Sequence, residues 1–570
     1  MKTKLIIIAA GIGLLIVSCA KEGMPPGGPE DKTPPVILNT FPENEAVRVD
    51  PNTEVLIQFS EIVKIAQPED AIFISPFPGE NVKYGWKGKA LSIKFPEPLR
   101  ENRTYVVTVG TKIKDLRNNP LAETFALAFS TGDSLDRCTL SGIVESPKSP
   151  QGIDVWAYQI EEDAEPDPAN RPPDYRVQCD QSGRFAFSNL AEGTYRLFAV
   201  RDQMADNFYQ RGEDEIGVPC FDVRAVPAAG SPAIPDIYFK TCFEDTTAPS
   251  LVRARANDSN SCTVQFDEEV LPDDGDWLAC FEIHDTQDSL NLLAIHEIIP
   301  TPLKSDVITL LTDTMTGGCP YQLKVSGLSD LSGNAIDTNY CTADFTGESR
   351  PDTMCPSITI MEPNPGTRDV LVEEAVHLIF SEPMDTTGKG IHLAIDDSTQ
   401  MFIAGTLDWW GSMELYYYPN ILLDGKTAYR VFIDSLSLSD LAGNFLPDTT
   451  WKFTTINPDT LSEISGIITD PEATASGSIV VQARTVGKTS RIQETYLFES
   501  GLYSIKNLLP GLYVLSAYRD SNEDGFYSYG MAYPYLPSER YMLYSDTVKI
   551  RSRWPNEGND FSLPPESFYP

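Results

Sequence analysis

The chain has 570 residues, of which 41% are hydrophobic, and it contains 44 prolines and 38 glycines. This length exceeds what one hydrophobic core can organise, and the apolar content excludes a chain that is disordered throughout. The formal net charge of −38 argues against nucleic acid as a partner, because an acidic surface repels phosphate, and it suits an extracellular setting or divalent cations.

The N-terminus has the form of an export signal. Lys2 and Lys4 precede an apolar run over residues 5–17, which is too short to span a bilayer as a stable helix. The run ends in Leu15-Ile16-Val17-Ser18-Cys19, which resembles the lipobox of bacterial lipoproteins. The resemblance implies a signal peptide over residues 1–18 and a mature protein that begins at an acylated Cys19, with palmitate among its chains.

The residues after Cys19 concern localisation. Ala20-Lys21-Glu22 is similar to the signal by which lipoproteins of Bacteroidota reach the cell exterior. The resemblance implies a protein anchored in the outer membrane by its lipid and exposed on the cell surface. Residues 19–32, rich in proline and glycine, are expected to form a flexible linker to the first domain.

Three stretches share one order of motifs: a proline-rich opening, a strand that ends in an acid, and an Asp-Leu turn before a last alternating strand. The acids are Glu61, Glu268 and Glu382, and the turns are Asp115-Leu116-Arg117-Asn118-Asn119, Asp330-Leu331-Ser332-Gly333-Asn334 and Asp440-Leu441-Ala442-Gly443-Asn444. We expect the Asp to cap its own turn, the Leu to tuck beneath it, and the next residues to accept positive φ. Each turn then closes a β-sandwich with a hairpin.

These motifs resemble the bacterial Ig-like domain of the S-layer type. The resemblance implies three Ig-like domains, which we name A1 (residues 33–133), A2 (residues 244–348) and A3 (residues 349–457). Because a catalytic acid is rarely tripled, the recurring glutamates favour a structural role at the strand end.

A second repeat fills the remaining chain. Leu140-Ser141-Gly142-Ile143-Val144 and Ile464-Ser465-Gly466-Ile467-Ile468 open it, and Gly193-Thr194-Tyr195 and Gly511-Leu512-Tyr513 lie in its later strand. The pattern resembles the carboxypeptidase regulatory-like (transthyretin-like) β-sandwich, an accessory fold without hydrolytic chemistry. We name these units B1 (residues 134–243) and B2 (residues 458–570). The expected fold is all-β, a string of five sandwiches in the order A1, B1, A2, A3, B2.

No catalytic residues are predicted. The chain has four histidines, and His296-Glu297 begins like a zinc-protease helix, but Pro300 stands at the second ligand position and would break that helix. The sequence has neither a Gly-x-Ser-x-Gly elbow nor a glycine-rich phosphate loop. No cofactor is required by this composition.

The strongest local pattern for a ligand is Asp520-Ser521-Asn522-Glu523-Asp524-Gly525 in B2. Asp520, Asn522 and Asp524 offer oxygen at alternate positions and Gly525 permits a sharp turn, as in a calcium loop, although Met531 stands where such a loop has its bidentate Glu. The pattern therefore favours either calcium or a plain acidic turn. The corresponding stretch of B1, residues 202–207, lacks the central oxygen ligand.

The cysteines suit an exported protein. Nine of the 10 follow Cys19, and none has the Cys-x-x-Cys spacing of a zinc site. The register of the A repeats places Cys262 and Cys341 on facing strands of one core, so we predict a disulfide between them; buried free thiols are the alternative.

Two further patterns concern glycans. Asp-Ser and Asp-Thr recur at domain junctions, at Asp133, Asp245, Asp352 and Asp459, and are similar to the O-glycosylation signal of Bacteroidota, although they are also turn residues. Trp409, Trp410 and Tyr417, within the aromatic runs of A3, are candidates for stacking on sugars. Successive residues of a strand point to opposite faces, so part of each run is expected in the core.

The sequence thus predicts a non-enzymatic lipoprotein of the outer membrane that acts as a stalk or as an interaction or adhesion scaffold. The predicted partners are membrane lipid through Cys19 and a protein or glycan that the sequence does not identify. The alternatives are a carbohydrate-binding lipoprotein and an accessory subunit of an outer-membrane assembly or transport complex.

Overall fold

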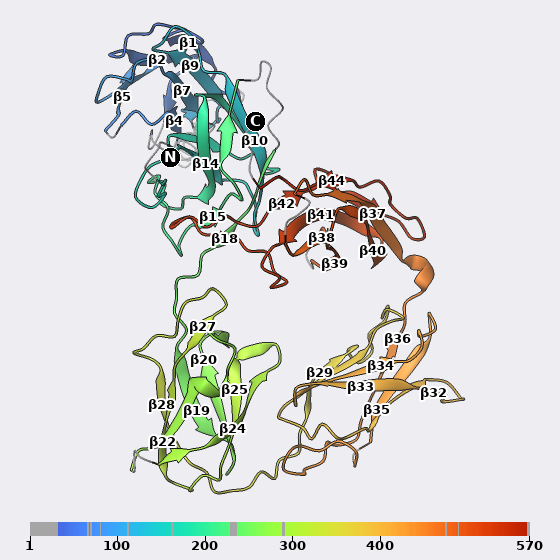
Figure 1. Cartoon of the computed structure of the whole chain (residues 1–570). Helices are drawn as coiled ribbons and strands as arrows, with labels where there is room; N and C mark the ends of the chain where they lie inside the picture. The colour runs from blue at the N-terminus through green and yellow to red at the C-terminus, as the bar shows by residue number, and fades with distance from the viewer. Residues whose placement is uncertain are drawn as a thin grey trace, which may run out of the picture.

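The computed structural model describes residues 32–566 except 65–67, 69–70, 80, 111–112, 161–164, 228–235, 288–290, 435, 473–475 and 488–489. This part of the chain consists of β-strands with two short 3-10 helices, η2 (Leu278–Cys280) and η3 (Pro458–Thr460) (Figure 1). The predicted all-β fold of tandem β-sandwiches is confirmed. Among these residues no helix has the length and apolar character needed to cross a membrane. The predicted signal peptide and the predicted lipidation site Cys19 lie outside the described residues.

Unit A1 is a sandwich whose strands alternate buried and solvent-facing residues. One sheet has the order β1 (Ile37–Phe41), β2 (Glu54–Phe59), β6 (Ala90–Lys94), β5 (Lys83–Lys87), and the other has the order β4 (Ile72–Ser75), β7 (Thr104–Val109), β9 (Phe125–Ser130). A two-stranded ladder joins β3 (Val63–Lys64) to β8 (Lys114–Asp115). Val55, Ile57 and Phe59 are fully buried, as the period-two pattern predicts.

Units A2 and A3 repeat this plan. The sheets of A2 are β19 (Leu251–Ala256), β20 (Ser261–Phe266), β25 (Lys304–Thr312), β24 (Ile295–Thr301) and β23 (Leu292–Leu293), β22 (Phe281–Asp285), β26 (Pro320–Val325), β28 (Thr342–Thr346), with a ladder of β21 (Val270–Pro272) and β27 (Leu328–Asp330). Those of A3 are β29 (Ile358–Glu362), β30 (Val376–Phe380), β34 (Glu414–Pro419), β33 (Gly405–Trp410) and β32 (Phe402–Ile403), β31 (Ile391–Ile395), β35 (Ala428–Ile433), β36 (Thr449–Thr454). Each unit encloses its own apolar cluster.

The Asp-Leu turn before the last strand works as predicted in one respect and not in another. Asp440 is buried, and its carboxylate accepts the Asn444 backbone N–H at 2.8 Å and the Asn444 side-chain N–H at 2.9 Å. The turns at Asp115 and Asp330 make the same contacts. The leucines, however, are exposed, so the expectation that they tuck beneath the turn was wrong. The Asp side chain takes the inner position, and the next residue therefore faces solvent.

Units B1 and B2 share a different plan, in which the first strand of the unit pairs in parallel with a later one. B1 has the sheets β13 (Arg184–Leu190), β10 (Cys138–Glu145), β17 (Ile237–Lys240) and β12 (Tyr175–Gln178), β11 (Asp154–Gln159), β14 (Gly193–Arg201), β15 (Glu215–Gly217), β18 (Cys242–Phe243), with β16 (Val223–Ala225) on β14. B2 has β40 (Gly501–Leu508), β37 (Ser462–Thr469), β44 (Phe561–Ser562) and β39 (Ile492–Leu497), β38 (Ser478–Thr485), β41 (Gly511–Asp520), β42 (Tyr541–Leu543), with β43 (Val548–Ile550) on β41. The unit boundaries stay a prediction from the sequence.

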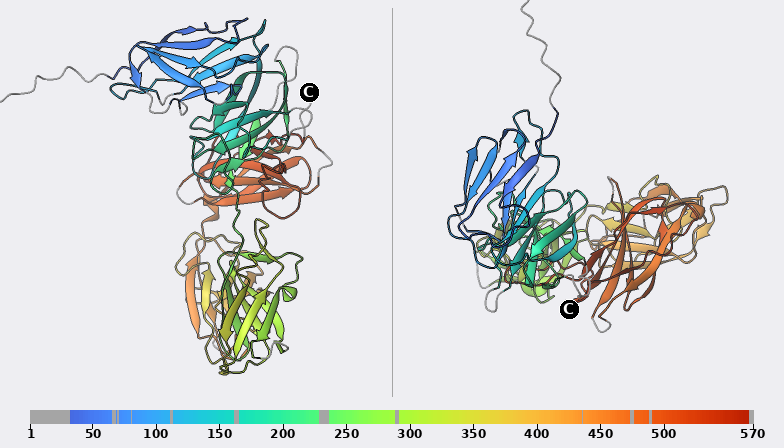
Figure 2. Two further views of the ribbon diagram at one scale, coloured as in Figure 1. Left: turned by 90° about the vertical axis from the view of Figure 1, so that its left-hand side faces the viewer. Right: turned by 90° about the horizontal axis from the view of Figure 1, so that it is seen from above.

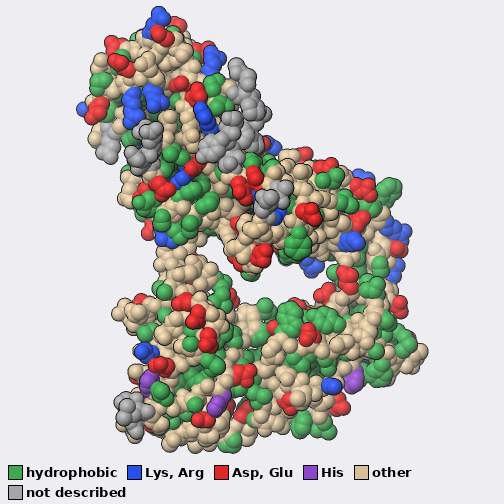
Figure 3. Space-filling model, viewed as in Figure 1, with side chains coloured by type: hydrophobic (Ala, Val, Ile, Leu, Met, Phe, Trp, Pro, Cys, Tyr) green, Lys and Arg blue, Asp and Glu red, His purple; other side chains and the backbone are tan. Residues whose placement is uncertain are grey.

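The string of units is not open. B2, at the C-terminal end of the chain, lies against B1, so that B1, A2, A3 and B2 form a closed circuit from which A1 projects (Figures 1 and 2). The space-filling view shows an opening enclosed by these four units (Figure 3). The sequence patterns did not predict this closure.

Candidate functional site

The predicted calcium loop lies at the end of β41, where the chain leaves the sheet of B2. Asp520 is only 4% exposed, and its Oδ2 accepts the Gly525 N–H at 3.0 Å. Asp524 Oδ1 accepts the Phe526 N–H at 2.7 Å, and Asn522 Nδ2 donates to Asp524 Oδ2 at 2.7 Å. The structure thus brings the three predicted side chains together around one turn.

One oxygen of this cluster has no partner. Asp520 Oδ1 is buried and accepts no hydrogen bond from any described residue. A buried acceptor left in this state costs about 1–3 kcal/mol, and such groups in native structures call for a ligand, water or ion. Asp520 Oδ1 has no donor because the Asp524 N–H donates instead to Asn522 Oδ1, at 3.3 Å.

Sequence analysis missed a fourth oxygen donor, Glu539. The Arg519 N–H donates to the Arg540 carbonyl at 3.0 Å, which places Glu539 across the hairpin from Asp520. The Glu539 carboxylate is 8% exposed and accepts the N–H groups of Ser521 at 2.6 Å and Ser528 at 3.1 Å. Burial raises the pKa of Glu539, and the backbone donors oppose that shift.

Glu539 was missed because the spacing of a calcium loop puts its last acid at position 531, which is occupied by Met531 in this chain. In the structure Met531 and Leu536 exchange two backbone hydrogen bonds, which close a small excursion of the chain. The residues that follow return to the sheet at Glu539. The available signal was the cross-strand pairing of Asp520 rather than its distance along the sequence.

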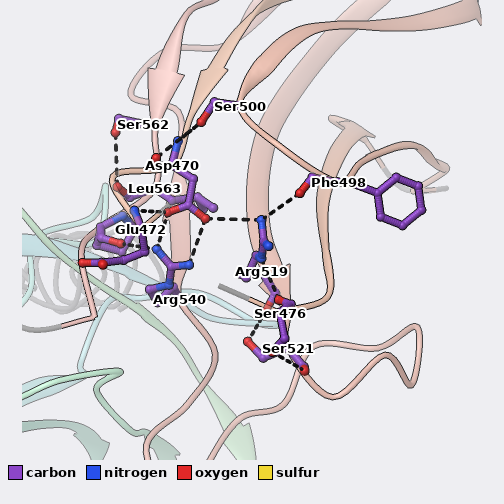
Figure 4. Close-up of polar contacts among 11 residues, drawn as sticks. Asp470, Glu472, Ser476, Phe498, Ser500, Arg519, Ser521, Arg540, Ser562 and Leu563 are labelled. Carbon is purple, nitrogen blue, oxygen red and sulfur yellow. Dashed lines mark hydrogen bonds and ion pairs between the residues drawn. The ribbon is translucent and has the colours of Figure 1, made fainter. Parts of the chain in front are cut away.

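A buried ion network lies behind this loop (Figure 4). Asp470 Oδ1 and Oδ2 accept from Arg540 at 2.5 and 2.9 Å, and Asp470 Oδ2 is 3.4 Å from Arg519 Nη1. All three side chains are buried. Because both guanidinium groups are directed to Asp470, neither forms an ion pair with Asp520, Asp524 or Glu539 among the described contacts.

The counterpart loop of B1 shares some of these backbone contacts, but its Asp206 N–H donates to Asp202, and none of its described carboxylate oxygens is buried without a partner. Asp202 accepts the N–H groups of Asp206 at 3.3 Å and Asn207 at 2.8 Å, one on each oxygen. Asp214, which faces Asp202 as Glu539 faces Asp520, accepts those of Gln203 at 3.0 Å and Gln210 at 2.9 Å. Burial raises the pKa of Asp214, as it does that of Glu539.

The side chain of Gln210 completes the B1 loop. Its Nε2 lies 3.2 and 2.9 Å from the two carboxylate oxygens of Asp206, to which it donates. Ser528 takes this position in B2 and is too short to do the same. Met204 takes the position of Asn522 and offers no oxygen. The sequence-based view that residues 202–207 are the poorer cation loop agrees with these contacts.

The same excursion of B2 makes the contact with B1. Ala532 is buried, with Tyr535 beside it, on a B1 surface of Trp156, Tyr158, Phe198, Val200, Tyr209, Ile216 and Val218. The Tyr535 hydroxyl donates to the Pro219 carbonyl at 2.9 Å, and the Arg196 guanidinium lies 3.5 Å from the Tyr535 ring centroid.

A second part of this contact is aromatic and charged. Lys240 of B1 lies 4.9 Å from the ring centroid of Tyr527, and its burial lowers its pKa. Glu145 of B1 pairs with Arg484 and accepts the hydroxyl of Tyr541, both of B2. The two units are therefore joined by apolar burial, by the contact of Lys240 with Tyr527 and by polar pairs at Glu145.

The predicted sugar-stacking residues divide between two environments. Tyr417 is buried, and its hydroxyl donates to the Ile403 carbonyl at 2.5 Å, so its assignment as a ligand residue was wrong and it belongs to the core. Trp409 is half-buried and stacks on Phe380 at 5.6 Å. Trp410 is 57% exposed, and its ring centroid lies 4.9 Å from that of Tyr416. Tyr416 in turn stacks on Tyr418, with ring centroids 5.7 Å apart. An outward aromatic row of these three residues remains.

Two of the three recurring strand-end glutamates, Glu268 and Glu382, lie in clusters of acids. Carboxylate oxygens of Asp245, Glu268 and Asp330 lie within 4.8 Å of one another, as do those of Asp352, Glu382 and Asp440. Burial, with Asp352 and Asp440 nearby, raises the pKa of Glu382 to about 7. The Asp of each junction was not linked to this cluster by sequence analysis, because it lies far from the other two acids along the chain.

The described cysteines are free thiols. Cys262 and Cys341 do adjoin one core, that of A2, but they are not bonded to each other, so the predicted disulfide is absent from the structure. Cys262 is fully buried, whereas Cys341 sits at the edge of the core with its thiol 3.3 Å from the Thr338 carbonyl. The alternative of thiols that pack as small apolar groups fits both residues.

Hollows large enough for a ligand lie between units. One of about 430 Å³ is lined by residues of A1 and B1, and one of about 740 Å³ is lined by residues of A3 and B2. Neither lining includes a histidine or a cysteine. His296 lies in β24, a strand, so the zinc-protease likeness ends there.

Comparison with known proteins supports the fold of two A units. A family model described as a bacterial Ig-like domain matches residues 31–131 and 352–455. No curated protein matches the chain.

Among solved structures, the N-terminal part of the bacterial S-layer protein SbsC is 16% identical, with a TM-score of 0.17, over 37% of this chain and 45% of that one. This chain therefore spans less than half of that structure. Domains 1-6 of SbsC are 9% identical, with a TM-score of 0.17, over 92% of this chain and 67% of that one. An L,D-transpeptidase from Mycobacterium smegmatis is 13% identical, with a TM-score of 0.16, over 37% of this chain and 90% of that one. Scores this low say nothing about how the units are arranged or what they do.

Proposed function

We propose that the protein is a non-enzymatic scaffold on the outer surface of a bacterium, held to the outer membrane by lipid on Cys19. The observation that carries the scaffold role is the contact between B1 and B2, which closes four β-sandwiches into a ring. A closed ring bends less than an open string, because motion at one junction must be matched at the others. It therefore presents loops of different units at fixed separations, which suits a partner that touches more than one of them.

The Ig-like units and the carboxypeptidase regulatory-like units both serve this role as rigid parts. Neither hollow between units is lined by histidine, the most frequent general base, or by cysteine, and this supports a role other than catalysis. Under this proposal O-linked glycans on the Asp-Ser and Asp-Thr junctions protect exposed connections, and the partner is a protein of the cell surface or of a transport complex.

The anchor is tested by fractionation of cells that express Cys19→Ser. We expect this variant in the soluble fraction and Cys355→Ser, which removes an exposed thiol of the mature chain, in the membrane fraction with the wild type. Retention of Cys19→Ser in membranes would overturn the lipid anchor. Protease treatment of intact cells then separates the two sides of the membrane, since a surface protein is cleaved and a periplasmic one is protected.

Glycan binding is the second candidate, and the outward row of Trp410, Tyr416 and Tyr418 favours it. Exposed aromatic rings along one sheet face offer the flat apolar surface on which sugar rings stack. The test is binding of the purified protein to immobilised polysaccharides. Trp410→Ala is expected to abolish binding and Trp86→Ala, an exposed tryptophan of A1, to leave it unchanged; equal binding by both variants would exclude the row.

A further inference from the structure

We propose that the outward face of one A3 sheet, formed by β29, β30, β34 and β33, binds a basic segment of a partner protein through aromatic rings and carboxylates. The inference rests on the scaffold role proposed above, and it names the surface and the chemistry by which the scaffold holds its partner. It assigns the outward aromatic row to arginine and lysine side chains, where glycan binding is the second candidate function.

The charge of this sheet differs from that of the equivalent sheets in A1 and A2. The four A3 strands contain no lysine or arginine, and their acids are Glu362, Asp408 and Glu414. The equivalent strands of A1 contain three lysines and one glutamate. Those of A2 contain two arginines and one lysine beside their acids. Of these three sheets, that of A3 alone offers negative charge without positive side chains of its own that would repel a basic ligand.

The strand register sets the acids beside the aromatic rings. Four successive cross-strand partners run over the sheet from edge strand β33 to edge strand β29: Asp408, Tyr416, His377 and Glu362. Trp410 and Glu414 are cross-strand partners next to this line. The rings of Tyr416 and His377 are stacked, with centroids 4.2 Å apart. A cation that lies over these rings therefore has a carboxylate on either side of it.

The polar atoms of two rings already have partners on this face. Trp410 Nε1 donates to Asp408 Oδ2 at 3.1 Å. The Tyr416 hydroxyl donates to Glu414 Oε1 at 2.8 Å, and burial together with this hydrogen bond raises the pKa of Tyr416 to about 12, so the hydroxyl keeps its proton. Asp408 Oδ1 and Glu362 Oε1 accept no hydrogen bond from a described residue. The face therefore offers acceptors and ring surfaces more than it offers donors.

Such a face suits basic side chains better than sugars. Lysine and arginine side chains carry donors and no acceptor, whereas a hydroxyl group, which sugars carry in number, is both donor and acceptor. Arginine stacks on tryptophan and tyrosine rings and pairs with carboxylates through its planar fork. Trp410 is 57% exposed and Tyr418 is 40% exposed, so both rings are open to this contact. The net charge of −38 attracts a basic partner over a longer range.

Fluorescence anisotropy of a labelled hexa-arginine peptide, titrated with the full mature chain carrying Cys19→Ser, tests the face at about 0.15 M salt, which screens the long-range attraction. We expect Trp410→Ala and Asp408→Asn each to weaken binding about fivefold, and Trp410→Phe, which keeps a ring, to weaken it less. Trp86→Ala is the matched control, because Trp86 lies on the equivalent edge strand of A1 among lysines, and it should bind as the wild type does. Glu123→Gln, which removes one exposed charge of A1, should also leave binding unchanged.

Equal affinity in the wild type, W410A and D408N would mean that the overall charge holds the peptide, and it would overturn the inference. So would binding of hexa-citrulline, which has a similar shape without the charge, as tightly as hexa-arginine. Retained peptide binding by W410A together with lost polysaccharide binding would assign the row to a glycan instead. Because the peptide is tested on the soluble chain and the anchor is tested in cells, a failure of peptide binding leaves the scaffold role standing. Circular dichroism checks that each variant is folded.

Discussion

The corresponding hairpins of B1 and B2 carry acids at the same positions, but the groups that donate hydrogen bonds to these acids differ. Each places two acids opposite each other, Asp202 with Asp214 and Asp520 with Glu539, and each uses backbone N–H groups to hold them. In B1 every oxygen of the pair has a donor, whereas in B2 Asp520 Oδ1 has none. The difference teaches that the side chain two residues after the first Asp, Met204 or Asn522, decides whether each carboxylate oxygen of the pair has a protein donor.

The ion networks behind the two loops differ by an exchange of charge. In B1, Arg201 pairs with Glu215 at 2.8 Å, and the Ser146 hydroxyl donates to Glu215 at 2.5 Å. In B2 the positions of Arg201, Glu215 and Ser146 hold Arg519, Arg540 and Asp470. Where B1 has a glutamate, B2 has an arginine, and where B1 has a serine, B2 has an aspartate. Each buried site therefore contains a carboxylate that pairs with its arginine side chains.

Removal of the Asp470 carboxylate is expected to have the largest effect on the difference between the two units. Asp470→Ala leaves the buried guanidinium groups of Arg519 and Arg540 without their carboxylate, and breaking a buried pair in this way costs about 3–5 kcal/mol. Amide hydrogen exchange of β37, β38 and β41 in the full chain would report the loss, because unfolding of one unit need not involve the others. Ser146→Ala in B1 should cost about 1 kcal/mol. Similar losses in the two units would contradict the assigned roles.

The contact between the two B units is the next target. Tyr535→Ala removes the ring beneath Arg196 and the hydrogen bond to Pro219, and we expect it to weaken ring closure by about 1–2 kcal/mol and increase the radius of gyration. Tyr533, on the same excursion, is 51% exposed, so Tyr533→Ala is the control and should scatter as the wild type does. An unchanged radius in Tyr535→Ala would show that the rest of the interface closes the ring without this residue.

The acid cluster of A3 raises the pKa of a carboxyl group as well, that of Glu382. The folded state holds a proton on Glu382 up to about pH 7, whereas the ordinary pKa is 4.5, so folding binds a proton between these values. The resulting stability is fully present below about pH 4.5 and is lost as the pH rises through 7. Thermal unfolding of A3 within the chain should therefore shift to lower temperature between pH 5 and 8. Glu382→Gln should remove this shift, and a shift of equal size in the variant would contradict it.

Much of the fold follows from local pattern. Val55, Ile57 and Phe59 alternate with polar residues and are buried, and Asp440 with Asn444 forms a turn whose chemistry is contained within five residues of sequence. Such features depend on near neighbours, and the repeats displayed them more than once. Trp410 and Tyr417 also follow the alternation, although which of them faces the core could not be read without the strand register.

Closure of the ring and the role of Glu539 depend on distant contacts. One signal for closure is present in β11, where Val155-Trp156-Ala157-Tyr158 is apolar at every position, as in a strand buried on both faces. The sequence does not say which surface covers the second face. Glu539 likewise joins its site through pairing across strands, and the junction aspartates Asp245 and Asp352 join theirs through contacts with the turns at Asn334 and Asn444, which spacing along the chain does not reveal.

The smallest expected effect is also the sharpest use of the comparison: conversion of the B1 loop into the B2 type. In M204N/Q210S the new Asn should draw the Asp206 N–H away from Asp202, and Asp206 should then accept from the Phe208 N–H and the new Asn amide, as Asp524 does from the corresponding groups in B2. If these two side chains decide cation binding, calorimetry should detect more calcium bound by the double variant than by the wild type. Q210S alone should show little of it, because Asp202 then keeps both of its backbone donors. Since Asp202 and Asp214 are unchanged throughout, a double variant without added calcium binding would mean that these two side chains do not decide cation binding.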